Sequence, residues 1–319
     1  MKKILCVLMS CLLFVMAGCS GHSKNLKFGA ADIGGVYYSF ASTFTQLADN
    51  EIDGYTFETK TTAGSVANLR LISDGYIDLA IVQADLLSDA YNATGTFADK
   101  KYQKGYKAVA SLYTECCQIV VRKDSGITGI DDLINKTVSV GASESGTEKN
   151  AEQILKMSGI TDELINKVNM DYTEAAEKLK AGEIDAFFCT AGTRTEVIGQ
   201  LSKECDIRFI SPDDKCIDKM LSAYSLCEKY TIPAGTYNGQ DSDVTTIGVK
   251  AVLIAKQSLS DDVIKNVTKT IYEHADDFKY ATSLDISFDI NTAADGVDIP
   301  FHSGAAAYYT ERGINVLTE

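Results

Sequence analysis

The stretch Phe28-Gly29-Ala30-Ala31-Asp32-Ile33-Gly34 decides the fold, because Val140-Gly141-Ala142-Ser143-Glu144-Ser145-Gly146 echoes it 112 residues later. Each stretch starts as an apolar strand, passes through glycine and small residues, and opens a helical pattern. A second echo pairs 74–80 with 181–187, which share Gly-x-Ile-Asp before an apolar strand. In both, the glycine suits the end of a helix, where a positive φ is required. The chain is therefore predicted to have two similar halves.

Strands that alternate with helices predict an α/β protein with parallel sheets covered by helices. Apolar, β-rich segments at 118–122 and 246–254 join the halves, and no low-complexity linker separates them. We therefore expect two Rossmann-like lobes with two crossover hinge strands and a cleft between the lobes. Lobe I is assigned to 26–117 and 248–319, and lobe II to 118–247. The alternative is that the short Gly-x-Ile-Asp echoes are a chance similarity.

The N-terminus has the layout of a secretory signal peptide. Lys2 and Lys3 precede an apolar run of 13 residues, which is too short to span a bilayer. Ala17-Gly18-Cys19 resembles the bacterial lipobox, so residues 1–18 are predicted to be removed and Cys19 to carry lipid. Residues 19–25 would form a tether that holds the protein outside the cytoplasm on a membrane, on either side of the envelope. The alternative is a plain secreted protein cut nearby.

Composition narrows the possible partners. The 319 residues include 30 Lys and Arg against 44 Asp and Glu, which gives a formal net charge of −14. Loss of residues 1–18 removes two lysines and no acid, which leaves −16. This acidity argues against nucleic acid as a partner, and we expect a monomer. Six cysteines remain, either paired or free: Cys116, Cys117, Cys189, Cys205, Cys216 and Cys227.

The predicted site lies where helices begin after strands, because such N-termini carry free N–H groups and partial positive charge. Four segments qualify, and plain helix capping is the alternative for each. The expected ligand-binding residues are Gly34, Gly35, Tyr38, Ser65, Asn68, Gln83, Ser145, Gly146 and Thr147. Arg194 is the best cationic partner for an anion, whereas Arg70 is expected at the surface or between the lobes. Catalytic motifs are missing, so we expect no enzyme, no cofactor and no metal.

These residues carry a family resemblance. The turn 34–38, the run Thr62-Ala63-Gly64-Ser65-Val66-Ala67-Asn68-Leu69-Arg70-Leu71-Ile72, and the segments 77–83 and 299–305 resemble the TAXI family of TRAP transporter solute-binding proteins. The resemblance implies a type II periplasmic-binding-protein fold. It also implies capture of a small carboxylate, such as glutamate, a related amino acid or a dicarboxylate, and delivery to the TRAP permease subunits. Ser39 and Ala41 stand where members often have proline and glycine.

The expected mechanism is capture by closure. The open lobes bind the solute on one face, and closure brings the second lobe onto it and excludes water. Two alternatives stay open at this point. One is a solute-binding lipoprotein of an ATP-driven importer, and the other is a surface sensor lipoprotein without a transport role.

Overall fold

The computed structural model describes residues 23–98, 102, 104–283 and 288–319. One ten-stranded sheet runs through it in the order β2-β1-β3-β10-β4-β7-β5-β6, with β8 paired to β4 and β9 to β10. The strands are β1 (Lys24–Gly29), β2 (Tyr55–Lys60), β3 (Leu79–Gln83), β4 (Tyr106–Arg122), β5 (Thr137–Ser139), β6 (Asn166–Val168), β7 (Ala186–Ala191), β8 (Ile207–Phe209), β9 (Cys227–Ile232) and β10 (Val244–Lys256). The α-helices are α2 (Val36–Glu51), α3 (Ser65–Ser73), α4 (Ala84–Asn92), α5 (Gly146–Met157), α6 (Tyr172–Ala181), α7 (Glu196–Glu204), α8 (Asp214–Ala223), α9 (Asp261–Glu273), α10 (Ala275–Thr282) and α11 (Ser303–Thr310).

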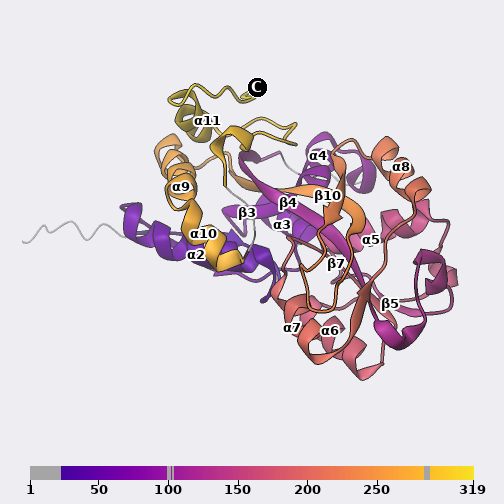
Figure 1. Ribbon diagram of the computed structural model, residues 1–319. Coiled ribbons are helices and arrows are strands. Elements are labelled where there is room, and N and C mark those ends of the chain that lie inside the picture. Colours follow the sequence, from indigo (N-terminus) through magenta and orange to yellow (C-terminus); the bar gives the residue numbers. More distant parts are fainter. Residues whose placement is uncertain (1–22, 99–101, 103, 284–287) are drawn as a thin grey trace, which may run out of the picture.

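Two similar α/β units lie on either side of the long strands β4 and β10. In the first unit, β2, β1 and β3 are parallel, and β10 pairs antiparallel with β3. In the second unit, β6, β5 and β7 are parallel, and β4 pairs antiparallel with β7. We call the first unit, with α2–α4 and α9–α11, lobe I, and the second, with α5–α8, lobe II. Figure 1 shows α2, α9 and α10 at the left of β4 and β10, α5 and α8 at their right, and α6 and α7 below them.

The two crossover strands are confirmed and are longer than predicted. They pair with each other from Gly248↔Cys116 to Lys256↔Tyr106, with two register shifts. Only the second end of β4 was predicted from the sequence, and β6, β8 and β9 were not predicted. The predicted fold class, an α/β protein of the type II periplasmic-binding-protein kind with two crossover hinge strands, is the one observed.

The Gly-x-Ile-Asp echo has the same structural role in both lobes. Gly75 and Gly182 follow α3 and α6 with φ values of 83° and 75°, a conformation that costs glycine little. Asp78 accepts a hydrogen bond of 2.9 Å from Lys27 N within β1, and Asp185 accepts one of 2.9 Å from Thr137 N, the first residue of β5. The motif therefore joins the end of a helix to the edge of a parallel strand in each lobe.

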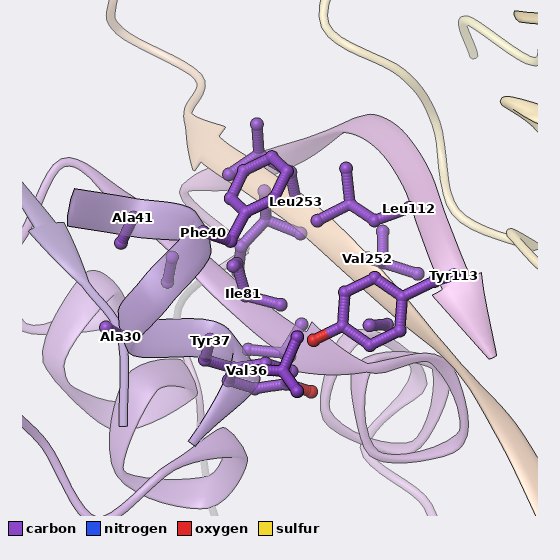
Figure 2. Packing of buried hydrophobic residues seen from close by; sticks show 14 of the residues in the cluster. Ala30, Val36, Tyr37, Phe40, Ala41, Ile81, Leu112, Tyr113, Val252 and Leu253 are labelled. Atoms are coloured by element: carbon purple, nitrogen blue, oxygen red, sulfur yellow. The ribbon is translucent and has the colours of Figure 1, made fainter. Parts of the chain in front are cut away.

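Aromatic side chains of α2 form the centre of the lobe I core. Phe40 stacks on Phe278 of α10 with ring centroids 4.4 Å apart, and Phe44 meets Phe28 of β1 edge-on at 5.5 Å. Figure 2 shows Phe40 beside Leu253 of β10, with Val36 and Tyr37 from the same helix nearby. This packing fixes the start of α2 relative to the crossover strands.

Parts of the described chain differ from what the sequence predicts. The amphipathic pattern of residues 261–280 predicts a single helix, but the structure has a break at His274, which separates α9 from α10. The strand β1 begins at Lys24, inside the segment assigned to the tether, whereas the signal peptide and Cys19 lie outside the described residues. The six remaining cysteines are free thiols. No helix in the described part of the chain is long and apolar enough to span a membrane.

Candidate functional site

A cavity lies between the two lobes at the carboxyl ends of the parallel strands. Lobe I contributes α2, α3 and the end of β3, lobe II contributes α5, α6 and β7, and β4 forms the floor. Its lining residues are Ala31, Asp32, Gly35, Val36, Tyr37, Ala63, Gly64, Ser65, Gln83, Glu115, Ala142, Ser145, Gly146, Thr147, Tyr172, Thr190 and Ala191.

Three helix N-termini converge on this cavity. The N-cap residues of α2, α3 and α5 are Gly35, Gly64 and Ser145, and all three line it. The starts of α3 and α5 approach each other from opposite lobes, since a Cβ on Gly64 would lie 3.6 Å from the Cα of Ser145. Each N-terminus carries about half a positive charge. This part of the cavity therefore favours an anionic group of a solute.

Two carboxyl groups also line the cavity. Glu115 of β4 is 2% exposed, and burial raises the pKa of its carboxyl to about 8, although hydrogen bonds with Tyr37 and Gln83 lower it. Burial and the nearby charge of Asp171 raise the pKa of Asp32 to about 6. Among the described residues that line the cavity, none is lysine, arginine or histidine. The site thus combines helix N-termini with two carboxyl groups.

Strand register explains why Glu115 and Gln83 face the cavity together. Glu115 is paired with Val249 of β10, and Gln83 is paired with Ala251 of the same strand. Side chains two residues apart on a strand lie on the same face, and paired residues share a face. Glu115 and Gln83 therefore project from the same side of the sheet. Tyr37 at the start of α2 donates to Glu115 Oε2 at 2.7 Å.

Gln83 connects the two lobes at the cavity. Its Nε2 donates to Asn150 Oδ1 of α5 at 3.0 Å, whereas its Oε1 is buried and has no hydrogen-bond donor among the described residues. Gly146, at the start of α5, allows this approach, because a Cβ there would lie 2.3 Å from Gln83 Oε1. Lobe II thus packs directly on the end of β3.

A second set of contacts between the lobes lies beside the cavity. The Arg70 guanidinium forms two hydrogen bonds with the Glu144 carboxylate, at 3.2 and 2.6 Å, and Ala67 N donates to Glu144 O at 3.0 Å. This confirms the expectation that Arg70 lies between the lobes. With these contacts made, the cavity keeps a volume of about 30 Å³, so a solute reaches it only when the lobes separate.

Six of the predicted ligand-binding residues line the cavity: Gly35, Ser65, Gln83, Ser145, Gly146 and Thr147. Gly34 lies in a second groove beside Val197 of α7. Tyr38 is half-buried and does not line the cavity, whereas its neighbour Tyr37 does. Arg194 is exposed and also lies outside the lining. The side chain expected to pair with an anion is therefore not brought to the other predicted residues.

Asn68 lies outside the cavity and is fully buried. Its Nδ2 donates to Ala30 O at 2.7 Å and Ile81 O at 2.9 Å, and its Oδ1 accepts from the Thr62 hydroxyl at 2.8 Å. The side chain therefore joins β3 to the loops that follow β1 and β2. Ser65 is not the helix cap either, because its Oγ accepts from Gln83 N at 3.1 Å.

In lobe II, Ser145 does cap α5, by accepting from Glu148 N at 3.0 Å. The hydroxyl of Thr147 lies 2.6 Å from the hydroxyl of Tyr172 and accepts from Thr190 N at 3.1 Å. The two side chains that were expected to grip a carboxylate are therefore engaged within their own lobe. They leave the start of the helix itself as the surface offered to a solute.

Five polar residues line the cavity that were not predicted from the sequence: Asp32, Tyr37, Glu115, Tyr172 and Thr190. One signal was available, since Glu115 is the only acidic residue in the 17 residues of β4, a strand that is mostly buried. A carboxyl group in such a strand is rarely left without a role. The face of the sheet on which the Glu115 side chain lies, however, depends on the pairing of β4 with β10, which is remote in sequence.

Comparison with known proteins assigns the family. The sequence profile of the NMT1-like family matches residues 28–313. This chain belongs to the NMT1-like family. The match spans both lobes and every residue that lines the cavity.

Solved structures with the same fold share little sequence with this NMT1-like protein. PhnD1 from Prochlorococcus marinus in complex with methylphosphonate has a TM-score of 0.59 at 11% identity, over 83% of this chain and 93% of that one. A putative L-cystine ABC transporter protein from Listeria monocytogenes has a TM-score of 0.51 at 16% identity. The match covers 82% of this chain and 94% of that one. The alkanesulfonate-binding protein SsuA from Xanthomonas axonopodis pv. citri bound to MOPS has a TM-score of 0.50 at 12% identity. The match covers 81% of this chain and 78% of that one. These likenesses establish the fold.

Proposed function

We propose that this protein is an extracytoplasmic solute-binding protein that captures a small polar solute in the cavity between its lobes. The observation that carries the proposal is the convergence of three helix N-termini from both lobes on one buried cavity. Relatives in fold that are described with methylphosphonate or MOPS bound support it. The bound group facing these N-termini is an anionic part of the solute, such as a carboxylate.

Closure of the two lobes is the step that captures the solute. Contacts such as the Arg70–Glu144 pair and the Gln83–Asn150 hydrogen bond form only when the lobes meet. A solute that touches both lobes shifts the equilibrium toward this state, because it binds the closed form more tightly than the open one. The closed form is then the one that a membrane importer recognises. The protein itself performs no chemistry on the solute.

For the membrane partner, an ATP-driven importer is the better supported choice. The Listeria relative in fold is described as part of an ABC transporter, whereas a TRAP permease rests on the resemblance of residues 62–72 and the other quoted segments to the TAXI family. The neighbouring genes separate the two. Genes for an ATPase and its permease support the first, and a gene for a TRAP permease supports the second. The N-terminal signal and a lipid on Cys19 remain part of the proposal.

A thermal-shift screen tests the binding function. The mature protein is unfolded and refolded to strip any bound solute, then heated with amino acids, dicarboxylates, sialic acids, sulfonates and phosphonates. A solute at 100 times its Kd adds about 2.7 kcal/mol to the free energy of unfolding, which is easily detected. A shift with one class, lost in a variant that fills the cavity, supports the proposal. The absence of a shift with every class contradicts it.

A further inference from the structure

The acidic part of the cavity specifies the solute more closely, an inference that rests on the proposed binding function. We infer that the solute carries a positively charged N–H group, such as an ammonium, and that this group binds Glu115 and the side-chain oxygen of Gln83. Together with the helix N-termini that line the same cavity, this makes the solute an amino acid or a related amino-carboxylate, and not a simple dicarboxylate.

The side-chain oxygen of Gln83 lacks a hydrogen-bond donor. Asn150 Nδ2 donates to Gln153 Oε1 at 3.4 Å, so Asn150 Oδ1 is the atom that faces Gln83 and accepts from its Nε2. This contact fixes the orientation of the Gln83 amide and leaves its Oε1 as a buried acceptor without a donor. Buried acceptors in proteins are nearly always satisfied. A solute with N–H groups supplies the missing donor, and a carboxylate does not.

The charge around Glu115 also favours an ammonium group. A buried carboxylate requires a counter-ion or several donors. Tyr37 and Gln83 supply one donor each, and no cationic side chain lines the described part of the cavity. The titratable groups that act on Glu115 from the surrounding elements are all acids, phenols or thiols: Tyr37, Asp85, Tyr113, Cys116, Tyr172 and Cys189. An ammonium group has three donors and one positive charge, so it meets both needs.

The competing arrangement is a protonated Glu115 that donates to a carboxylate of the solute. It would leave Gln83 Oε1 facing another acceptor. The two arrangements predict opposite pH dependence. Binding of an ammonium requires the ionised carboxyl, so a proton on Glu115 must leave to solvent and affinity falls as the pH is lowered. Binding of a carboxylate by the protonated form strengthens as the pH is lowered.

The experiment compares matched pairs of probes by isothermal titration calorimetry on the mature protein. Each amino compound is measured beside the acid that lacks its amino group: L-glutamate with glutarate, L-aspartate with succinate, 4-aminobutanoate with butanoate, and the other common amino acids likewise. The variants are Glu115→Gln, which keeps the shape and removes the charge, and Glu58→Gln, a control at an exposed carboxyl of β2. Wild-type protein is also titrated at pH 5, 6, 7 and 8.

The inference expects an amino compound to bind at least tenfold more tightly than its partner. Glu115→Gln should weaken that binding by roughly 10- to 100-fold, the usual effect of a hydrogen bond to a charged group, and Glu58→Gln should leave it within twofold. Affinity should fall from pH 8 to pH 5. The pH series on wild-type protein keeps the test valid even where Glu115→Gln fails to fold.

Three results would overturn the inference: equal binding of a deaminated acid, unchanged or tighter binding by Glu115→Gln, or affinity that rises as the pH is lowered. If a deaminated acid, methylphosphonate or MOPS binds in the cavity instead, the ammonium site is wrong and the binding function stands. If no probe of any class binds, both are wrong.

Discussion

Replacement of Asn68 by alanine removes an amide that holds lobe I together, away from the cavity. Its Nδ2 donates to the carbonyls of Ala30 and Ile81, and its Oδ1 accepts from the Thr62 hydroxyl. The side chain is fully buried, so water does not replace these hydrogen bonds in the variant. We therefore expect Asn68→Ala to reduce the free energy of unfolding while leaving the solute contacts intact.

The size of this effect follows from the partners that are left behind. The Ala30 carbonyl gains a replacement donor, because the Thr62 hydroxyl lies 3.0 Å from it and can turn its single proton there once Asn68 Oδ1 is removed. The Ile81 carbonyl loses the Asn68 amide at 2.9 Å. The unpaired Ile81 carbonyl costs about 1–3 kcal/mol, and the one further hydrogen bond lost on balance costs about 1 kcal/mol. The expected loss of stability is about 2–4 kcal/mol.

Urea denaturation of the solute-free protein, followed by circular dichroism, measures this loss. Asn50→Ala is the matched control, because Asn50 is an exposed amide on α2 whose replacement should change the free energy of unfolding by no more than about 0.5 kcal/mol. A loss below 1 kcal/mol in Asn68→Ala would refute the reasoning. So would a folded variant of normal stability that no longer binds solute, because that result would place Asn68 in the site.

Three further predictions concern closure, the cavity and pH. Removing Arg70 or Glu144 should weaken solute binding, because the pair joins the closed lobes. The coupling between them in a calorimetric double-mutant cycle should be only about 0.5–1 kcal/mol, because both side chains are 42% exposed. A coupling near zero would show that the pair does not act on closure. Gly146→Val should weaken binding more than tenfold, because even a Cβ lies 2.3 Å from the Gln83 side-chain oxygen; an unchanged Kd in a titration would place the solute elsewhere. Burial raises the pKa of Asp85 from 3.8 to about 6, so its protonated form stabilises the fold below pH 4 and this contribution is lost as the pH rises through 6. Urea titrations from pH 4 to 7 should therefore favour Asp85→Asn over the wild type by a difference that grows by roughly 3 kcal/mol; a constant difference would contradict the buried carboxyl.

The sequence predicts the lobes well because their signals are local. Gly75 and Gly182 adopt the positive φ values that the echo implies, and the apolar strands that follow them lie where expected. The helix starts that line the cavity were also predicted, since each follows a strand and a glycine or serine. Features of this kind depend on a few neighbouring residues, and these are visible in a single sequence.

The missing parts depend on contacts between distant segments. The helix expected over 261–280 ends at His274, whose ring contacts Asp277 in the next helix and Glu51 of α2. The role of Glu115 follows from pairing with β10, more than 130 residues later. Asn68 was expected in the cavity because it lies one turn after Ser65, yet its face of α3 turns toward β3 and the loop after β1. Sequence spacing alone does not resolve these directions.

The central claim is that a small solute binds between the lobes, and a crystal structure with the solute found by the screen tests it most directly. The account predicts electron density in the cavity, with a positively charged nitrogen beside Glu115 and an anionic group facing the starts of α3 and α5. Density in the groove beside Val197, or an anionic group placed on Glu115 with no nitrogen nearby, would contradict it.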